Sequence, residues 1–176
     1  LSEFTDSGEA LEKLETGVDR AVLSTDDPSV YRYDQMDTNS SENSSMQMGT
    51  NSTAYYFSVA SSSIANFFDE MYLNTPWEQH YNNLDGRTIL DRLASVKYFV
   101  VKKGKESDLP YGYSRLSGEA EKNGKTYLAY ADEDALPLGY TYDSWISRED
   151  YDKMTVTEKQ QALLQGVVLD DSSLPE

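Results

Sequence analysis

The chain has 176 residues, of which 38% are hydrophobic and 12% aromatic, with 14 Tyr against 5 Phe. This apolar content predicts a folded domain rather than a disordered chain, despite a mean hydropathy of −0.66. The 31 acidic and 15 basic residues give a formal net charge of −16, which disfavours nucleic acid and anionic lipid headgroups as partners. The absence of cysteine excludes disulfide and thiol chemistry.

The apolar runs and the two ends of the sequence indicate whether the chain spans a membrane and whether it is part of a longer protein. The longest apolar run, around residues 98–101, is far shorter than the roughly 20 residues that cross a bilayer. A start at Leu1 and the acidic end DDSSLPE favour a segment of a longer protein. We expect a single domain over residues 1–176, with an N-terminal helix and connection over 1–29, a main body over 30–169 and a loose tail over 170–176.

The first elements alternate with polar connections. Asp6 and Glu9 form a capping-box pattern, and apolar residues at helical spacing then predict an amphipathic helix. These apolar residues are Leu11, Leu14, Val18 and Val22. Residues 30–34 and 54–60, VYRYD and AYYFSVA, predict two strands. Between them, eleven of the sixteen residues 38–53 are Ser, Thr or Asn, so only Met46 and Met48 offer apolar contacts.

Residues 61–101 predict two helices and a strand. Three serines at 61–63 offer N-caps for a helix that buries one apolar stripe. The stripe consists of Ile64, Phe67, Phe68, Met71 and Tyr72. The turn LDGR at 84–87 leads into a short helix with Ile89, Leu90 and Leu93. VKYFVV at 96–101 follows as the strongest strand candidate, which we expect at the centre of a sheet.

The C-terminal half predicts a hairpin and two helices. Asn123-Gly124 is a type I′ turn signal, so residues 115–121 and 126–131 are expected to pair antiparallel. An extended run over 136–146 precedes a helix opened by Ser147 and Asp150 and another opened by Thr155 and Glu158. The second helix is predicted to close at Gly166, and residues 167–169 to return to a sheet edge. These elements predict an α+β fold, with helices packed on a mixed, largely antiparallel sheet.

Motifs for catalysis, metals and nucleotides are absent from the sequence. His80 is the only histidine and has no G-x-S-x-G motif beside it, so we interpret it as a packing or surface residue. A calcium loop starting at Asp37 fails because Glu42 and Met48 occupy the positions of its Gly and bidentate Glu. Neither phosphate-loop pattern occurs. We therefore predict no catalytic residue, metal site or cofactor.

The carboxylates have one interpretation, and the aromatic residues leave two open. We interpret the carboxylate groups at Asp69-Glu70, Asp85 with Asp91, and 132–134 as solvated surface. Tyrosine and tryptophan rings near asparagine amides suit carbohydrate recognition. The alternative is that these tyrosines pack in the core with their hydroxyls in solvent. The rings are Tyr55, Tyr56, Trp77, Tyr81, Tyr111, Tyr113, Tyr140, Tyr142 and Trp145, and the amides are Asn43, Asn82 and Asn83.

Several segments, in this order, resemble one family. They are YRYD at 31–34, NSSMQMG at 43–49, the AYYFSV strand, LDGRTILDRLASVKYFVV at 84–101 and the segment from LPLGY to GVVL at 136–169. Together they resemble the extracytoplasmic portion of the bacterial YfhO-type membrane proteins. The similarity covers most of the chain after residue 30.

The resemblance implies a context for the chain. YfhO-type proteins are polytopic and look like GT-C-type glycosyltransferases, which use a polyprenyl-phosphate sugar to glycosylate cell-surface polymers such as lipoteichoic acid. The chain would then be an extracytoplasmic accessory domain that positions an acceptor polymer, such as an anionic glycopolymer, or a partner near the membrane portion of the same polypeptide. By the same resemblance, residues 38–53 are an ordered surface loop rather than a linker. A secreted carbohydrate-binding module and a purely structural domain are the alternatives.

The candidate ligand-binding residues are Arg32, Asn43, Tyr55, Asp85, Arg87 and Lys97. The three cations among them stand in an acidic chain, so each is expected to pair with a carboxylate or to meet an anionic ligand such as a polyol phosphate. A structural alternative pairs Arg87 with Asp91, one helical turn along.

Overall fold

The computed structural model describes residues 27–35, 43, 45–46, 49–75, 79–122 and 124–173, so the helix expected near the N-terminus lies outside the described residues. A four-stranded sheet has the order β1-β4-β6-β5, with β1 parallel to β4 and the other pairs antiparallel. Its strands are β1 (Arg32–Gln35), β4 (Val96–Lys102), β5 (Ser114–Lys122) and β6 (Lys125–Ala131). The α+β class is confirmed.

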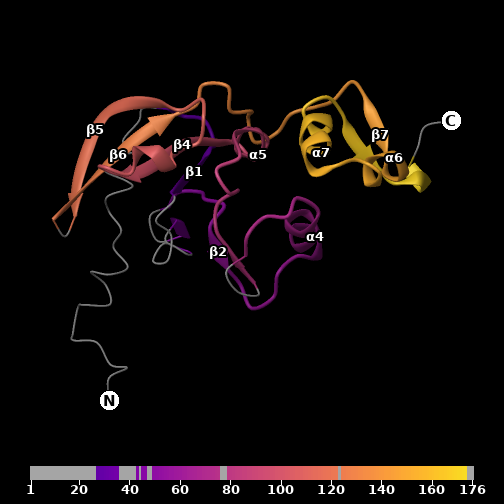
Figure 1. Ribbon diagram of the computed structural model, residues 1–176, viewed down its shortest axis with the longest axis horizontal. Helices are drawn as coiled ribbons and strands as arrows, with labels where there is room; N and C mark the ends of the chain where they lie inside the picture. Colours follow the sequence, from indigo (N-terminus) through magenta and orange to yellow (C-terminus); the bar gives the residue numbers. More distant parts are fainter. Residues whose placement is uncertain are drawn as a thin grey trace, which may run out of the picture.

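Two small sheets and four helices complete the described elements. The sheets pair β2 (Tyr55–Tyr56) with β3 (His80–Tyr81) and β7 (Trp145–Ser147) with β8 (Val167–Leu169). The helices are α4 (Ser62–Glu70), α5 (Thr88–Leu93), α6 (Arg148–Asp152) and α7 (Val156–Leu163), with 3-10 turns η1 (Glu106–Asp108) and η2 (Asp171–Ser173). Figure 1 shows the main sheet at one end of the molecule, the elements from β7 to β8 at the other, and α5 between them.

Strand β4 lies inside the main sheet, as its apolar sequence predicts, and is covered on both faces. Phe99 and Val101 belong to a core shared with α4 and α5, whereas Tyr98 and Val100 pack on the opposite face. Arg32 pairs with Val96 and Tyr33 with Tyr98, so Lys97 is an extra residue that forms a bulge. Both main cores therefore depend on this strand.

The hairpin follows its turn signal. Lys122 pairs with Lys125, which leaves a two-residue turn whose Gly124 has a φ of 69°. Strand content elsewhere is lower than the sequence predicts. In the segment 54–60, only Tyr55–Tyr56 form a strand, and in the run 136–146 the strand begins at Trp145. Each of these short strands pairs with another short strand rather than with an edge of the main sheet.

Helix α4 buries less of its apolar stripe than the spacing predicts. Phe68 and Met71 are buried, but Ile64 and Tyr72 are 38% and 78% exposed. Tyr72 lies beyond the helix end with a φ of 48°. The helix packs through one narrow side, where Phe68 contacts Tyr81 edge to face, and its flanks border open hollows.

The C-terminal helices begin as their capping residues indicate, but α7 ends at Leu163 with its C-cap at Leu164 rather than closing at Gly166. The Ser147 side chain accepts a hydrogen bond from the Asp150 amide, and Thr155 and Glu158 form a full capping box. Strand β8 does not reach the main sheet, because it pairs parallel with β7. The segment from β7 to β8, which we call the C-terminal unit, thus forms its own small αβ layer (Figure 1).

The solvated-surface interpretation of the carboxylates is wrong for Asp91 and Asp132. Both are buried, as is Asp34. Arg92 binds Asp132 through two nitrogens at 2.7 and 3.2 Å, and Ser52 and Thr53 hydrogen-bond Asp34. Neither oxygen of Asp91 has a hydrogen-bond partner among the described residues, which include Arg87, so the Arg87–Asp91 ion pair that the sequence allowed does not form. Burial, with Asp34 and Asp132 nearby, raises the pKa of Asp91 from 3.8 to about 8.

The buried Asp91 predicts a pH-dependent stability. The folded chain retains a proton on Asp91 that the unfolded chain releases, so the contribution of Asp91 to stability is fully present below about pH 4 and is lost as the pH rises from about 4 to 8. We expect Asp91→Asn to remove up to about 1.4 kcal/mol per pH unit of that slope. Urea unfolding of both chains at pH 5.5, 6.5 and 7.5 measures the difference.

Burial raises the pKa of Asp34 to about 6. Asp34 therefore also makes the free energy of unfolding fall as the pH rises, but mainly below about pH 6. The exposed Asp143→Asn serves as the matched control and is expected to keep the wild-type slope. An unchanged slope in Asp91→Asn between pH 6.5 and 7.5 would show that Asp91 is ionised throughout.

Candidate functional site

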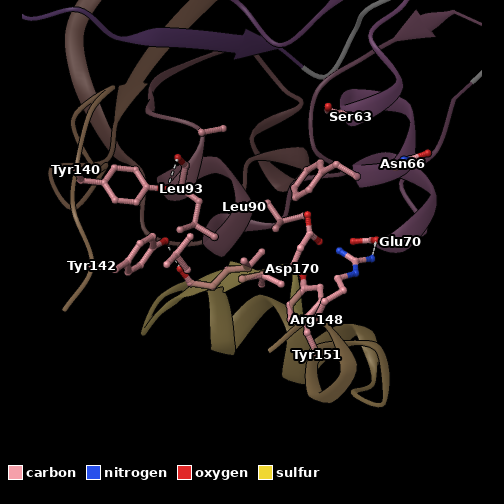
Figure 2. Close-up of a pocket in the computed structure, with 15 residues that line it drawn as sticks. Ser63, Asn66, Glu70, Leu90, Leu93, Tyr140, Tyr142, Arg148, Tyr151 and Asp170 are labelled. Atoms are coloured by element: carbon pink, nitrogen blue, oxygen red, sulfur yellow. Dashed lines mark hydrogen bonds and ion pairs between the residues drawn. The ribbon is translucent and has the colours of Figure 1, made fainter. Parts of the chain in front are cut away.

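Several hollows border helix α4. One, of about 660 Å³, lies between α4, α5 and the C-terminal unit, and we call it the large groove. Figure 2 shows Leu90 and Leu93 at its centre, Tyr140 and Tyr142 at one end, and Arg148 facing Glu70 at the other. The walls are mostly apolar, with polar groups at intervals, which is the usual composition of a small-molecule site.

One end of the large groove is closed by an ion pair. Arg148 of α6 bonds Glu70 of α4, 78 residues away in sequence, and also contacts Asp152 at 3.0 Å. Its guanidinium carbon lies 5.5 Å from the ring centroid of Tyr151, which is buried. This end therefore links the C-terminal unit to α4.

Two tyrosines close the opposite end. Tyr140 donates its hydroxyl proton to the carbonyl of Leu93 at 3.3 Å, and Tyr142 donates to the carbonyl of Leu163. Their rings meet edge to face with centroids 5.4 Å apart. Both hydroxyls thus satisfy helix C-terminal carbonyls, while the rings remain as groove surface.

Three polar side chains along the large groove have no hydrogen-bond partner in the described part of the chain. Ser63 and Asn66 lie on the α4 wall, and Asp170 lies on the opposite wall (Figure 2). None of the three side chains hydrogen-bonds any residue that the structure describes. A hydroxyl, an amide and a carboxylate beside apolar walls can bind a ring that has both hydroxyl groups and an apolar face.

The second hollow, about 490 Å³, lies on the other side of α4, and we call it the Arg32 pocket. It brings together three of the six predicted residues, Arg32, Asn43 and Tyr55. Arg32 is the only charged residue among the described residues that line it. The Tyr55 hydroxyl and the Thr50 Oγ1 are buried there without a hydrogen-bond partner in the described part of the chain.

Both arginines among the predicted residues bind backbone carbonyls at helix C-termini. Arg32 donates to the carbonyl of Ala94, the C-cap of α5, at 2.6 Å. Arg87 donates to the carbonyls of Met71 and Tyr72, just after α4, at 2.6 and 3.2 Å. A cation in this place satisfies unpaired carbonyls and complements the helix dipole. Arg87 therefore has a structural role, whereas Arg32 also faces a pocket.

Of the remaining predicted residues, Asp85 lies 3.7 Å from the guanidinium of Arg87, whereas Lys97 lies apart from both. Lys97 binds Asp27 at 2.6 Å, which raises the pKa of Lys97 and lowers that of Asp27. Asp85 accepts the amide of Asn74 at 2.9 Å in the turn before α5. These contacts give Lys97 and Asp85 local structural partners.

The polar loop is anchored by long-range hydrogen bonds. Asn43 exchanges two bonds with the backbone of Tyr56, at 2.9 and 3.1 Å, and Asn51 donates to the carbonyl of Tyr31. Met46, which the sequence offered as an apolar contact, is 68% exposed. In the described part of this loop, amide and hydroxyl side chains therefore replace a hydrophobic anchor.

Sequence reasoning missed most of the large groove. Ser63, Asn66 and Glu70 recur at i, i+3 and i+7 on α4, so their spacing alone could have marked a polar face. Arg148 and Asp170 carry no such signal, because their place depends on how the C-terminal unit packs. His80 stacks on Tyr56 with centroids 4.4 Å apart, and no metal-binding group of three His, Cys, Asp or Glu occurs among the described residues.

A family model described as "Bacterial membrane protein YfhO" matches residues 2–176. The chain belongs to the YfhO family. It is 26% identical over 157 residues to the protein named "Uncharacterized protein YfhO" of Bacillus subtilis (strain 168). That alignment covers 88% of this chain and 18% of the relative, so the chain spans less than a fifth of the relative's length. No solved structure matches the chain.

The YfhO match extends the similarity seen in the sequence motifs to the N-terminal region before residue 30. Members of the family are described as membrane proteins, and no helix of the described residues is long and apolar enough to span a membrane.

The ion pair at the end of the large groove can be measured by a double-mutant cycle. We expect Glu70→Gln and Arg148→Gln to show a coupling of about 0.5–1 kcal/mol in urea unfolding, because both side chains are partly shielded, at 24% and 37% exposed. The Glu149–Lys153 pair within α6 and its C-cap is the control, with a coupling below about 0.5 kcal/mol since both side chains are exposed. Equal coupling in the two cycles would contradict a link between α4 and the C-terminal unit.

Proposed function

We propose that the chain is an accessory extracytoplasmic domain of a membrane-embedded, glycosyltransferase-like protein that acts on cell-envelope polymers such as teichoic acids. In this proposal the domain positions the acceptor polymer near an active site located elsewhere in the polypeptide. Membership of a membrane-protein family supports the setting, and the large groove supports the positioning role.

The composition of the large groove carries the proposal. Apolar side chains such as Phe67 and Leu93 lie beside the free hydroxyl of Ser63 and the free amide of Asn66. Sugar rings have one apolar face and a rim of hydroxyls, so both kinds of surface are used in one contact. The groove is closed at one end by Glu70 and Arg148 and at the other by Tyr140 and Tyr142, which limits the length of the sugar chain that fits.

A binding role rather than catalysis suits the described residues. The only histidine is stacked on an aromatic ring, and the buried carboxylates lie in the core rather than along the large groove. Glu70 is engaged by Arg148. We therefore assign the large groove to recognition, with the chemistry in another part of the parent protein.

Titration of the 176-residue chain with neutral disaccharides tests the recognition role. Cellobiose, lactose and diacetylchitobiose, at up to about 20 mM, are expected to shift NMR amide signals of α4 and the C-terminal unit. We expect Asn66→Ala to weaken binding about fivefold, the usual effect of losing one hydrogen bond. Asn74→Ala, an exposed asparagine outside the large groove, is the control and is expected to bind like the parent chain.

No shift with any of the three sugars would contradict recognition of neutral sugar units in the large groove. Equal binding by Asn66→Ala and the parent chain would place the sugar elsewhere on the surface.

The extracytoplasmic location has its own test in the full-length parent protein. The chain has no cysteine, so Ser117→Cys on the exposed side of β5 introduces a single thiol into this segment of a cysteine-free parent. A membrane-impermeant maleimide is expected to label it in intact cells. Ala129→Cys, at a fully buried position, is the control that stays unlabelled. Labelling of Ser117→Cys only after permeabilisation would place the domain in the cytoplasm.

A further inference from the structure

We infer that the Arg32 pocket is a second binding site, separate from the large groove, and that it takes an organic phosphate ester. The inference goes beyond the proposed function because it concerns a different cavity and a different chemistry. Three observations support it: the charge of the lining, two buried hydroxyls without partners, and the size and rim of the pocket.

The charge of the lining favours an anion. Arg32 is the only charged residue among the described residues around the pocket, although the whole chain has a net charge of −16. In the described part of the chain no carboxylate lies within ion-pair distance of Arg32. Asp34 interacts with Arg32 electrostatically, but its oxygens already accept hydrogen bonds from Ser52 and Thr53. The guanidinium therefore lacks a direct anionic partner among the described residues.

The Arg32 side chain is also held in place for binding. One terminal nitrogen donates to the carbonyl of Ala94 at 2.6 Å, which orients the plane of the guanidinium. The remaining nitrogens make no hydrogen bond to the described residues. A planar guanidinium with free donors is suited to binding two oxygens of one phosphate group.

Two hydroxyls in the pocket are without partners. The Tyr55 hydroxyl and Thr50 Oγ1 are buried and have no hydrogen-bond partner in the described part of the chain. Buried polar groups are normally paired, so both mark positions that a polar ligand can occupy. Burial and the nearby Tyr81 raise the pKa of Tyr55 to about 12, so its hydroxyl remains a donor at neutral pH. Two hydroxyl donors and one guanidinium match an oxyanion with several acceptor oxygens.

The size of the pocket indicates more than an inorganic ion. Its volume of about 490 Å³ is in the range of small-molecule sites. The rim adds exposed apolar side chains, with Phe57 at 48%, Val59 at 88% and Ile64 at 38% exposure. An ester whose organic part contacts this rim uses both regions of the pocket, which favours an organic phosphate over free phosphate or sulfate.

The experiment uses glycerol phosphate as the probe and glycerol, inorganic phosphate and sulfate as comparisons. Calorimetry and NMR amide shifts on the 176-residue chain are expected to show millimolar binding of glycerol phosphate, weaker binding of the two inorganic ions and none of glycerol. We expect Tyr55→Phe to weaken binding about 5- to 10-fold, because it removes one hydroxyl and keeps the ring stacked on Tyr81. Arg32→Gln is expected to weaken it at least about 10-fold.

Matched controls separate the site from the general charge of the chain. Tyr56→Phe removes a hydroxyl from the neighbouring tyrosine outside the pocket, and Lys105→Gln removes an exposed positive charge. Both variants are expected to bind glycerol phosphate as the parent chain does. Asn66→Ala in the large groove is also expected to leave phosphate binding unchanged, so failure of sugar binding and failure of phosphate binding are distinguishable.

Two results would overturn the inference. One is the absence of any shift at about 20 mM glycerol phosphate, and the other is equal binding by Tyr55→Phe and the parent chain. If Arg32→Gln lowers the melting temperature through loss of the α5 cap, Tyr55→Phe alone decides, since it leaves that cap intact.

Discussion

Burial of strand β4 on both faces is the constraint on which the other elements depend. Phe99 and Val101 pack toward α4 and α5, while Tyr98 and Val100 pack on the opposite face of the sheet. The backbone N–H and C=O groups of a strand that is buried on both faces are shielded from water, so they need hydrogen-bond partners on both edges. Strands β1 and β6 supply these partners. Since β1 carries Arg32 and α5 leads directly into β4, the burial of one strand places the Arg32 pocket and the wall of the large groove.

Helix α4 separates two hollows of different chemistry. Its core contact is narrow, through Phe68 and Met71, and it is held further by Arg87 at its C-terminus and by Arg148 from the C-terminal unit. Because little of its surface is needed for the core, both flanks remain open. One flank offers a hydroxyl, an amide and a carboxylate beside apolar walls, and the other offers a cation with two hydroxyls that have no partner among the described residues.

The sequence predicted elements that depend on near neighbours and was less successful where distant contacts decide. The Asn123-Gly124 turn, the capping box at Thr155 and Glu158, and the apolar strand at 96–101 each carry a local signal. The burial of Asp91 and Asp132 carries no such signal, because acidic residues are normally solvated. For the candidate site, Arg32, Asn43 and Tyr55 were predicted and share a pocket, but the large groove emerged only from the packing of the C-terminal unit.

By itself the sequence determined the class of fold, the starts of the C-terminal helices and the acidic character of the chain, since composition and short-range hydrogen bonds set these properties. Tertiary structure decided which charges are buried, paired or left facing a hollow. Arg148 meets Glu70 across 78 residues, and Arg32 meets Ala94 across 62. Such pairs form only when β4 and its neighbours have assembled, because no local pattern specifies which distant carbonyl or carboxylate will lie within reach.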